Sequence, residues 1–186
     1  MATKTFCITS HSDSIRLAFI RFHYIKTVTE PGENGTKALS CINNHEVSQY
    51  LESKEANIII ATDGSIRDTC ISAWGGAVWQ NNRKTFEWCA GKQRRTSSFR
   101  AESEAYEDAL IWTRNNTTEE DRVVVLTDSL GLVARLKRGL VREHWVKTIC
   151  DIKADYHTTY IPGNAGIWYN ETADQLAGAA EPIGPM

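Results

Sequence analysis

The stretch Asn57-Ile-Ile-Ile-Ala-Thr-Asp-Gly-Ser65 decides how the rest of the sequence is interpreted. Its apolar run predicts a short buried strand, which is followed by an acid, Asp63, and then by Gly64 and Ser65. A carboxylate at the end of a packed strand is held rigidly enough for metal-ion catalysis, but Asp-Gly-Ser is also an ordinary turn sequence. The choice between these two interpretations depends on whether other segments supply partners for Asp63.

Composition describes an ordinary globular protein. The chain has 186 residues, enough for one well-packed domain with an appendage or for two small domains. Its apolar share is 41% and its charged share is 24%. The net charge of -2 excludes a globally basic nucleic-acid binder, so contacts with phosphates would have to come from local clusters of Lys and Arg.

The five cysteines are scattered and form no Cys-x-x-Cys pair, which favours reduced thiols in an intracellular compartment, the cytoplasm or the nucleus. No apolar run approaches the roughly 18 residues that a membrane span needs, and no signal-peptide core follows the first residues. We therefore expect an intracellular protein that has no membrane partner.

Residues 1–56 are expected to form an N-terminal extension of unknown role. In the segment from Ser14 to Val28, apolar residues occur at both odd and even positions, which fits either a buried strand or a buried helix. Pro31-Gly-Glu-Asn-Gly35 predicts a turn, and His45 to Lys54 predicts a short helix that leads into the first strand. No residue type or spacing in this extension indicates a catalytic or metal site.

From residue 57 onward the patterns predict the order β-β-β-α-β-α-α-β-α. The run Asp121-Arg-Val-Val-Val-Leu-Thr-Asp128 is, like the opening stretch, an apolar run that ends in Thr-Asp. Its continuous apolar character predicts a central strand covered on both faces. A helix begins near Phe99, because one apolar stripe runs through Ala101, Ala105, Ala109 and Trp112. We therefore expect an α/β domain over residues 57–180, a five-stranded mixed sheet with helices on both faces, and a C-terminal tail over residues 181–186.

Four acids follow strand ends or lie in helix turns that would face the same edge of this sheet: Asp63, Glu102, Asp128 and Asp174. Clustered carboxylates repel each other and destabilise the fold unless cations neutralise them. Oxygen ligands without Cys or His suit Mg²⁺ or Mn²⁺, and two such ions about 4 Å apart can activate a water and stabilise the leaving oxygen of a phosphodiester. The alternative for each acid is a solvated surface carboxylate.

Motifs around these acids occur in one fixed order: Thr62-Asp-Gly-Ser65, Ser98-Phe-Arg-Ala-Glu102, Leu126-Thr-Asp-Ser129, and Ile161-Pro-Gly-Asn-Ala-Gly166 followed by Asn170-Glu-Thr-Ala-Asp174-Gln-Leu-Ala177. They resemble the successive motifs of the type 1 ribonuclease H family. The Arg-Ala-Glu and Ile-Pro-Gly forms are most similar to the domains attached to reverse transcriptases of retroelements of the non-LTR retrotransposon type. Each motif alone is weak, but their order on the expected elements, over roughly two-thirds of the chain, is specific.

The resemblance implies a ribonuclease H-like fold and an endonuclease that hydrolyses the RNA strand of RNA/DNA hybrids. Cleavage would use two Mg²⁺ ions, which Mn²⁺ can replace, and would leave 5′-phosphate and 3′-hydroxyl ends. Asp63 would bridge both ions, and Asp174 would complete the ion that activates water. Glu102 and Asp128 would hold the ion at the leaving oxygen, with Glu102 also near a ribose 2′-hydroxyl. A reverse transcriptase domain is the further partner expected in the natural protein.

The resemblance also implies a set of substrate-binding residues: Ser65, Ser97, Ser98, Arg100, Asn164 and Asn170. Asn170 matches a position that orients the region of the scissile phosphate. Ser97 and Ser98 match the place of a contact with a DNA phosphate, although a helix cap explains serine there equally well. Further basic residues near the first and later helices would either hold phosphates or form a solvated face. Trp74 and Trp168 lie near the expected site and could touch a sugar or base.

Two departures from the family pattern keep other functions open. Asn164 stands where the family usually carries a histidine that assists product release, and His157 is interpreted as a residue of the sheet. The short path between Asp128 and Asn164 leaves little room for the basic helix and loop with which cellular members hold the hybrid. The alternatives are a weakly active or inactive nucleic-acid-binding module and, last, a 3′ to 5′ exonuclease, which would need an acid where this chain has Ser65.

Overall fold

The computed structural model describes residues 42–68 and 70–183, together with four short strands nearer the N-terminus. These strands are β1 (Thr3–Lys4), β2 (Cys7–Ile8), β3 (Ile15–Arg16) and β4 (Ile20–Tyr24). For the segment from Ser14 to Val28, the sequence left open a strand or a helix, and the residues of this segment that the structure describes form strands. The turn predicted at residues 31–35 lies outside the described residues.

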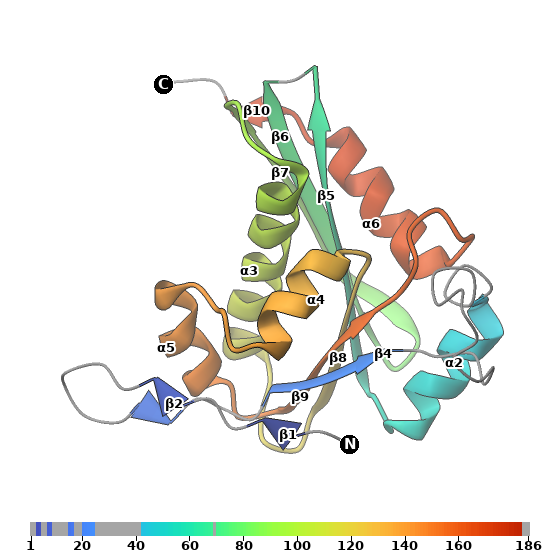
Figure 1. Cartoon of the computed structure of the whole chain (residues 1–186). Helices are drawn as coiled ribbons and strands as arrows, with labels where there is room; N and C mark the ends of the chain where they lie inside the picture. Colours follow the sequence, from blue (N-terminus) through green and yellow to red (C-terminus); the bar gives the residue numbers. More distant parts are fainter. Residues whose placement is uncertain are drawn as a thin grey trace, which may run out of the picture.

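The helix expected before the first long strand is confirmed as α2, which spans Asn44–Ser53. From residue 57 the elements then follow the predicted order (Figure 1). Their bounds are β5 Ile58–Arg67, β6 Ile71–Gln80, β7 Arg83–Gln93, α3 Ser98–Asn116, β8 Arg122–Thr127, α4 Leu130–Lys137, α5 Glu143–Asp151, β9 Asp155–Tyr160, α6 Trp168–Ala179 and β10 Pro182–Ile183. The mixed α/β class is confirmed.

The main sheet has eight strands, in the order β1-β4-β9-β8-β5-β6-β7-β10, whereas β2 and β3 pair only with each other. The prediction of five strands was therefore too low. Strands β4 and β1 extend the sheet beyond β9, and β10 extends it beyond β7. A strand of two residues has no periodicity to recognise, and its place at an edge depends on pairing with distant residues. The five expected strands form the centre, with β5, β6 and β7 antiparallel and β8 and β9 parallel to β5.

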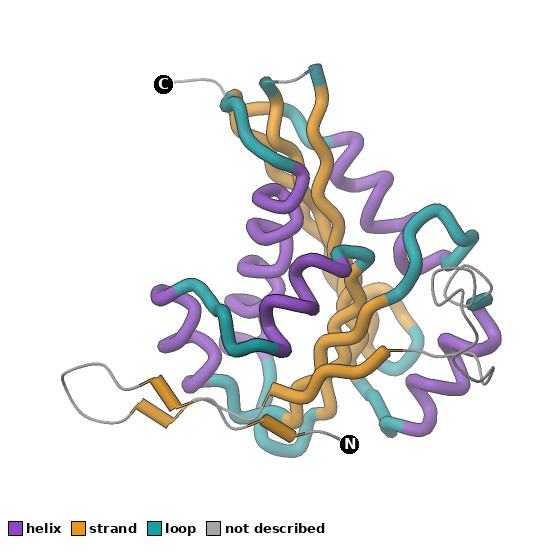
Figure 2. Tube along the Cα trace, viewed as in Figure 1, coloured by secondary structure: helices purple, strands orange, loops and turns teal. Residues whose placement is uncertain are grey.

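Two apolar cores lie on the two faces of the sheet, because successive side chains of a strand point to opposite faces. Ile60 and Val125 belong to the core under α3, α4 and α5, and Ile59 and Leu126 belong to the core under α2 and α6. Figure 2 shows the same division, with helices on both sides of the strands. Helix α2 precedes residue 57, where the domain was predicted to begin, and its apolar side is part of the second core.

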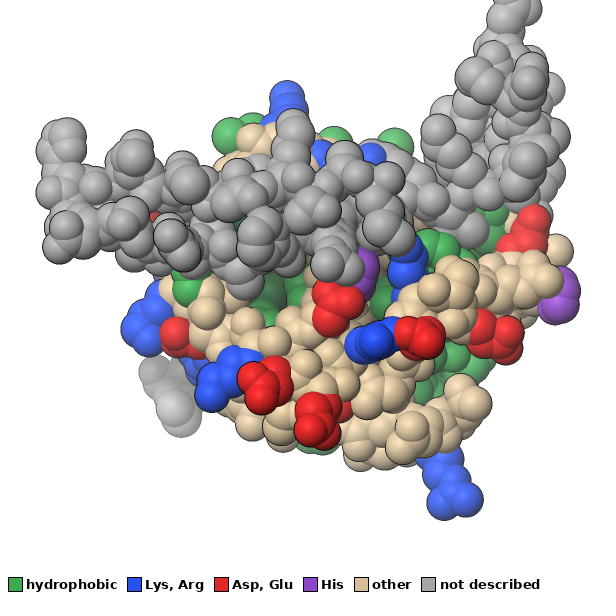
Figure 3. Space-filling model, turned by 90° about the horizontal axis from the view of Figure 1, so that it is seen from below, with side chains coloured by type: hydrophobic (Ala, Val, Ile, Leu, Met, Phe, Trp, Pro, Cys, Tyr) green, Lys and Arg blue, Asp and Glu red, His purple; other side chains and the backbone are tan. Residues whose placement is uncertain are grey.

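Charged side chains of both signs are mixed on the face seen in Figure 3, where the visible Lys, Arg, Asp and Glu residues alternate and form no patch of one sign. This distribution agrees with the small net charge of -2. Among the residues that the structure describes, no helix combines the length and the apolar character needed to cross a membrane.

Helix α6 approaches the sheet most closely at Gly75 of β6. A Cβ atom at this position would lie 2.7 Å from the Cβ of Leu176 and 2.8 Å from the backbone nitrogen of Ala177. These separations are shorter than any normal contact, so the helix could not keep its place above a larger residue. Gly178 lies in the same helix but has open space where its Cβ would be.

We expect Gly75→Ala to lower the free energy of unfolding by about 2 kcal/mol, because the added methyl group pushes α6 away from the sheet. Gly178→Ala is the matched control, and we expect it to leave this free energy unchanged or to raise it by up to about 1 kcal/mol. Urea unfolding followed by circular dichroism measures both values. Equal unfolding midpoints for the two variants would contradict the close approach of α6 to β6.

Candidate active site

The register of β5 and β8 places two acids side by side. Thr62 of β5 pairs with Thr127 of β8, so the residues that follow them, Asp63 and Asp128, lie at the same level of the sheet. Neighbouring strands are about 4.8 Å apart. Each acid is an even number of positions after the residues of its strand that pack under α6. Because alternate side chains of a strand point to the same face, both acid side chains leave the sheet on the face that α6 covers.

Glu102 reaches these acids from the first turns of α3. Gly64, directly after Asp63, packs so closely on α3 that a Cβ there would lie 2.2 Å from the backbone nitrogen of Glu102. Any larger residue at this position would therefore displace the helix. The hydroxyl of Ser129, the residue after Asp128, donates a hydrogen bond to the Glu102 carboxylate. Glu102 is thus held next to Asp63 of β5 and to Asp128, which directly follows β8.

Helix α6 supplies the fourth acid. Asp174 lies close enough to Asp63 to raise the pKa of its carboxyl, and Asn170, one turn earlier, lies close enough to Asp128 to oppose the rise in the pKa of that carboxyl. Gly75, which allows α6 to lie this close to the sheet, is the strand partner of Asp63. The structure therefore brings together the four acids that were singled out from the sequence.

Burial and mutual repulsion raise the pKa of two of these carboxyl groups, those of Asp63 and Asp128. Burial, followed by the charge of Asp128, raises the pKa of Asp63 to about 8, although the Gly64 N–H donates a hydrogen bond of 2.7 Å to it. Burial and then the charge of Glu102 raise the pKa of Asp128 to about 6, against the hydrogen bond from Asn170. Like charges at short range have this effect, and a cation among them would reverse it.

The donor set at this site consists of carboxylate oxygens, which suits hard divalent cations such as Mg²⁺ and Mn²⁺. Of these donors, Asp63 retains a proton near neutral pH that a cation would replace. Within residues 42–68 and 70–183, no three His, Cys, Asp or Glu side chains stand close enough together to enclose an ion. The residues present therefore fit a divalent ion by their chemistry, and the acids would have to move closer together to enclose it.

The loop between β9 and α6 lies against the acids. A Cβ at Gly163 would be 2.5 Å from the Oδ2 atom of Asp128, so a larger residue there would displace that carboxylate. Asn164 is the next residue, and it is exposed, with a φ of 54°. Ser65, on the strand side, has a buried hydroxyl that finds no partner among the described residues. Contacts of Asn164 and Ser65 with a substrate stay predictions.

The start of α3 carries the other predicted substrate residues. The Ser97 side chain accepts a hydrogen bond of 3.3 Å from the Arg100 N–H, so the helix-cap interpretation is confirmed for Ser97. Ser98 is the first residue of the helix, and both serines are exposed. The Nε atom of Arg100 lies 3.8 Å from Oε1 of Glu104, one turn further along. Contact of these residues with a DNA phosphate stays a prediction.

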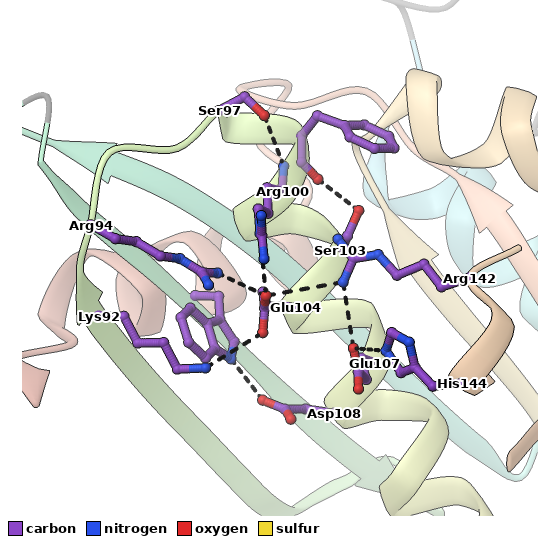
Figure 4. Close-up of polar contacts among 12 residues, drawn as sticks. Lys92, Arg94, Ser97, Arg100, Ser103, Glu104, Glu107, Asp108, Arg142 and His144 are labelled. Atoms are coloured by element: carbon purple, nitrogen blue, oxygen red, sulfur yellow. Dashed lines mark hydrogen bonds and ion pairs between the residues drawn. The ribbon is translucent and has the colours of Figure 1, made fainter.

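Glu104 gathers basic side chains from three parts of the chain (Figure 4). Arg94 lies 2.7 Å from its carboxylate, Lys92 3.9 Å and Arg142 4.0 Å, in addition to Arg100. Burial alone would raise the pKa of Glu104, but the hydrogen bond from Arg94 and the surrounding positive charges lower it. The basic residues near α3 therefore form a network organised by one carboxylate and do not point independently into solvent.

The remaining predictions concern two tryptophans and one histidine, and the structure gives a different result for each. Trp74 is buried and its indole N–H donates a hydrogen bond of 2.7 Å to Asp108, so it is a core residue and does not present a face to a sugar or base. Trp168 is 40% exposed and stacks on Tyr169 at a centroid distance of 3.8 Å. His157 is buried within β9, which confirms it as a residue of the sheet.

Two residues of the site were not recognised from the sequence. Ser129 both caps α4, by accepting from the Leu132 N–H, and donates to Glu102. Gly163 was named only as part of a motif, and its contact with Asp128 was not predicted. The cap of α4 could have been inferred from a serine that precedes an apolar helix. The contacts with Glu102 and Asp128 could not, because they join separate elements.

No protein-family model matches the sequence, and no curated protein matches it. Among solved structures, RNase H1 from the halophilic archaeon Halobacterium salinarum NRC-1 matches with a TM-score of 0.53 and 18% identity, over 66% of this chain and 96% of that chain. The foamy viral protease-reverse transcriptase in complex with an RNA/DNA hybrid matches with a TM-score of 0.53 and 20% identity, over 67% of this chain and 20% of that chain. The chain therefore has the ribonuclease H fold that the motifs predicted, and similar structures include an archaeal RNase H1 and a foamy viral protease-reverse transcriptase at the same TM-score.

The raised pKa of Asp63 predicts how the stability of the metal-free protein depends on pH. In the folded protein this carboxyl holds its proton up to about pH 8, whereas in the unfolded chain it loses the proton near pH 4. Stability therefore falls as the pH rises between these values, because the folded state binds the extra proton. Asn cannot ionise, so in EDTA we expect Asp63→Asn to be more stable than the unmodified protein at pH 8, by about 1 to 3 kcal/mol.

This difference should shrink toward pH 5, where the Asp63 carboxyl is protonated in the folded state. Urea unfolding at several pH values measures it. Asp151→Asn is the control, because Asp151 is exposed at the end of α5. If the unmodified protein and Asp63→Asn lose the same stability between pH 5 and pH 8, Asp63 does not carry the raised pKa.

Proposed function

We propose that this protein is a metal-dependent endonuclease that hydrolyses the RNA strand of RNA/DNA hybrids. The observation that carries the proposal is the meeting of Asp63, Glu102, Asp128 and Asp174 at one place, from four separate parts of the chain, with the repulsion expected of unneutralised carboxylates. The ribonuclease H fold supports the proposal as a scaffold, since its solved examples include an RNase H1 and an RNase H domain from Mycobacterium tuberculosis.

Two Mg²⁺ ions, which Mn²⁺ could replace, would supply an activated water and charge stabilisation at the leaving oxygen. Asp63, the most buried of the acids, would contact both ions, and Asp174 would complete one ion site from α6. Glu102 and Asp128 would complete the other. The protein's own contribution is to hold these oxygens in place: Ser129 orients Glu102, and Asn170 orients Asp128.

The hybrid would lie across the acids, with one strand near the start of α3. Ser97, Ser98 and Arg100 are exposed there, and the network around Glu104 adds positive charge beside them. On the other side, Asn164 is exposed on the loop that contacts Asp128, where it could influence product release. Ser65 and Asn170 would face the cleaved strand.

A role within a retroelement is the finer part of this proposal. The forms of the motifs support it, and the similarity to the foamy viral protein is compatible with it. In that setting a reverse transcriptase domain would hold the hybrid and compensate for the short connection between Asp128 and the loop at Asn164. The purified chain with and without such a domain would then differ mainly in KM for the hybrid.

We expect Asp63→Asn and Asp128→Asn each to lower the rate of RNA cleavage in a hybrid by at least about a hundredfold in Mg²⁺. Each substitution removes a charged ligand but preserves the shape of the side chain. Asp151→Asn, which changes an exposed acid paired with Lys147 at 2.9 Å, is the matched control and should cleave normally. Gel analysis of end-labelled hybrid measures the rates, and thermal unfolding checks that every variant is folded.

Unchanged cleavage in either site variant would refute the assignment of the acids. If the unmodified protein binds the hybrid but cleaves nothing in Mg²⁺ or Mn²⁺, the chain is a nucleic-acid-binding module on the same fold. Degradation of single strands from the 3′ end would instead identify an exonuclease.

A further inference from the structure

Asn44, at the start of α2, joins the N-terminal part of the chain to the site loop with both ends of its side-chain amide. Its Nδ2 donates a hydrogen bond of 2.8 Å to the carbonyl of Gly166, and its Oδ1 accepts a hydrogen bond of 3.0 Å from the N–H of Trp168. These two backbone groups lie on either side of Ile167, where the loop ends and α6 begins. One side chain therefore bonds to the backbone on both sides of the junction between the loop and α6, from 122 and 124 residues away in the sequence.

Helix α6 needs this contact because it has no cap of its own. Its N-cap residue is Ile167, which has no side-chain acceptor, and no side chain at that position caps the helix. The first N–H groups of a helix lack partners within the helix and are normally satisfied by a nearby Ser, Thr, Asp or Asn. Asn44 provides that acceptor from a different helix.

The capped junction leads directly to the acids on both sides. On the loop side, Gly163 packs against the Oδ2 atom of Asp128. On the helix side, Asn170 lies beside Asp128 and Asp174 lies beside Asp63, within the first two turns of α6. A change in where α6 begins would therefore shift an amide and a carboxylate at the site together.

Asn44 is itself held firmly. Helix α2 begins with a capping box, in which Asn43 accepts from the Glu46 N–H and Glu46 accepts from the Asn43 N–H. Val47 and Leu51 are buried in the core shared with α6. The hydroxyl of Tyr50 also lies 2.9 Å from that of Thr159 in β9, the strand that leads into the loop. Helix α2 therefore holds Asn44 in place, and Asn44 holds the end of the loop.

We propose that Asn44 is a positioning residue of the active site and that α2 is a working part of the catalytic domain. Asn44 fixes the start of α6 and the end of the site loop, and so sets where Asp174, Asn170 and Gly163 stand relative to Asp63 and Asp128. The consequence for cleavage rests on the proposed nuclease function, whereas the consequence for the order of the loop and helix does not.

The test uses the full chain with three variants. Asn44→Ala removes both hydrogen bonds, and Asn44→Asp keeps the acceptor for the Trp168 N–H but loses the donor to Gly166. Asn57→Ala is the matched control, because Asn57 also makes one donated and one accepted hydrogen bond with a distant segment, to Asp121 at 2.9 Å and from the Arg122 N–H at 2.7 Å. Asn57 precedes β5, about 20 Å of strand before Asp63.

Amide hydrogen exchange of the metal-free protein is the first measurement. Asn44→Ala should speed exchange at Trp168 by about tenfold or more, Asn44→Asp should restore most of the protection, and Asn57→Ala should leave it unchanged. This result does not require the protein to be a nuclease. Unchanged exchange at Trp168 in Asn44→Ala would overturn the proposed cap.

Steady-state cleavage of the hybrid is the second measurement. Asn44→Ala should lower kcat by about tenfold or more, with KM for the hybrid changed by less than about threefold, and should raise the Mg²⁺ concentration for half-maximal activity. Asn57→Ala should keep kcat and the Mg²⁺ requirement. An unchanged kcat in Asn44→Ala, or an equal loss in both alanine variants, would show that Asn44 only stabilises the fold. If the unmodified protein cleaves nothing, the nuclease proposal fails, and the exchange measurement still decides whether Asn44 caps α6.

Discussion

The parallel pairing of β5 with β8 brings Asp63 and Asp128 to the same level of the sheet, and the repulsion between their carboxylates is the constraint around which the site is built. Burial strengthens this repulsion, because water is not present to screen it. Neighbouring groups reduce it only in part. The Gly64 N–H supports Asp63, and Asn170 supports Asp128, yet the pKa values of both acids remain raised. A divalent cation is the partner that would remove the repulsion altogether.

The surrounding elements are adapted to come close to these acids. Gly64 admits the first turn of α3, Gly75 admits α6, and Gly163 admits the loop after β9, and at each of these positions even one methyl group would collide with a neighbour. Alanines on the inner face of α3 allow the helix to lie low on the sheet. The start of α6 is then fixed by Asn44 from α2, so the precision of the site extends into residues that precede the long strands.

The fold could be predicted and the four acids could be singled out because their signals are local. The apolar run of β5, the alanine stripe of α3 and the Thr-Asp ending of β8 each lie within one element, where periodicity and residue type are sufficient. The edge strands, the contact of Ser129 with Glu102 and the network around Glu104 depend on which elements become neighbours. The cap that Asn44 provides is the extreme case, since nothing near Ile167 indicates that its helix is capped from the N-terminal part of the chain.

The central claim is that the repelling carboxylates form a site for two divalent cations. A crystal of the full chain soaked in Mn²⁺ tests it most directly, because the anomalous signal of manganese locates each ion independently of the protein. We predict two peaks about 4 Å apart, with Asp63 between them, Asp174 on one and Glu102 and Asp128 on the other. Manganese bound elsewhere on the chain, or no manganese at these four acids at millimolar concentration, would contradict the account.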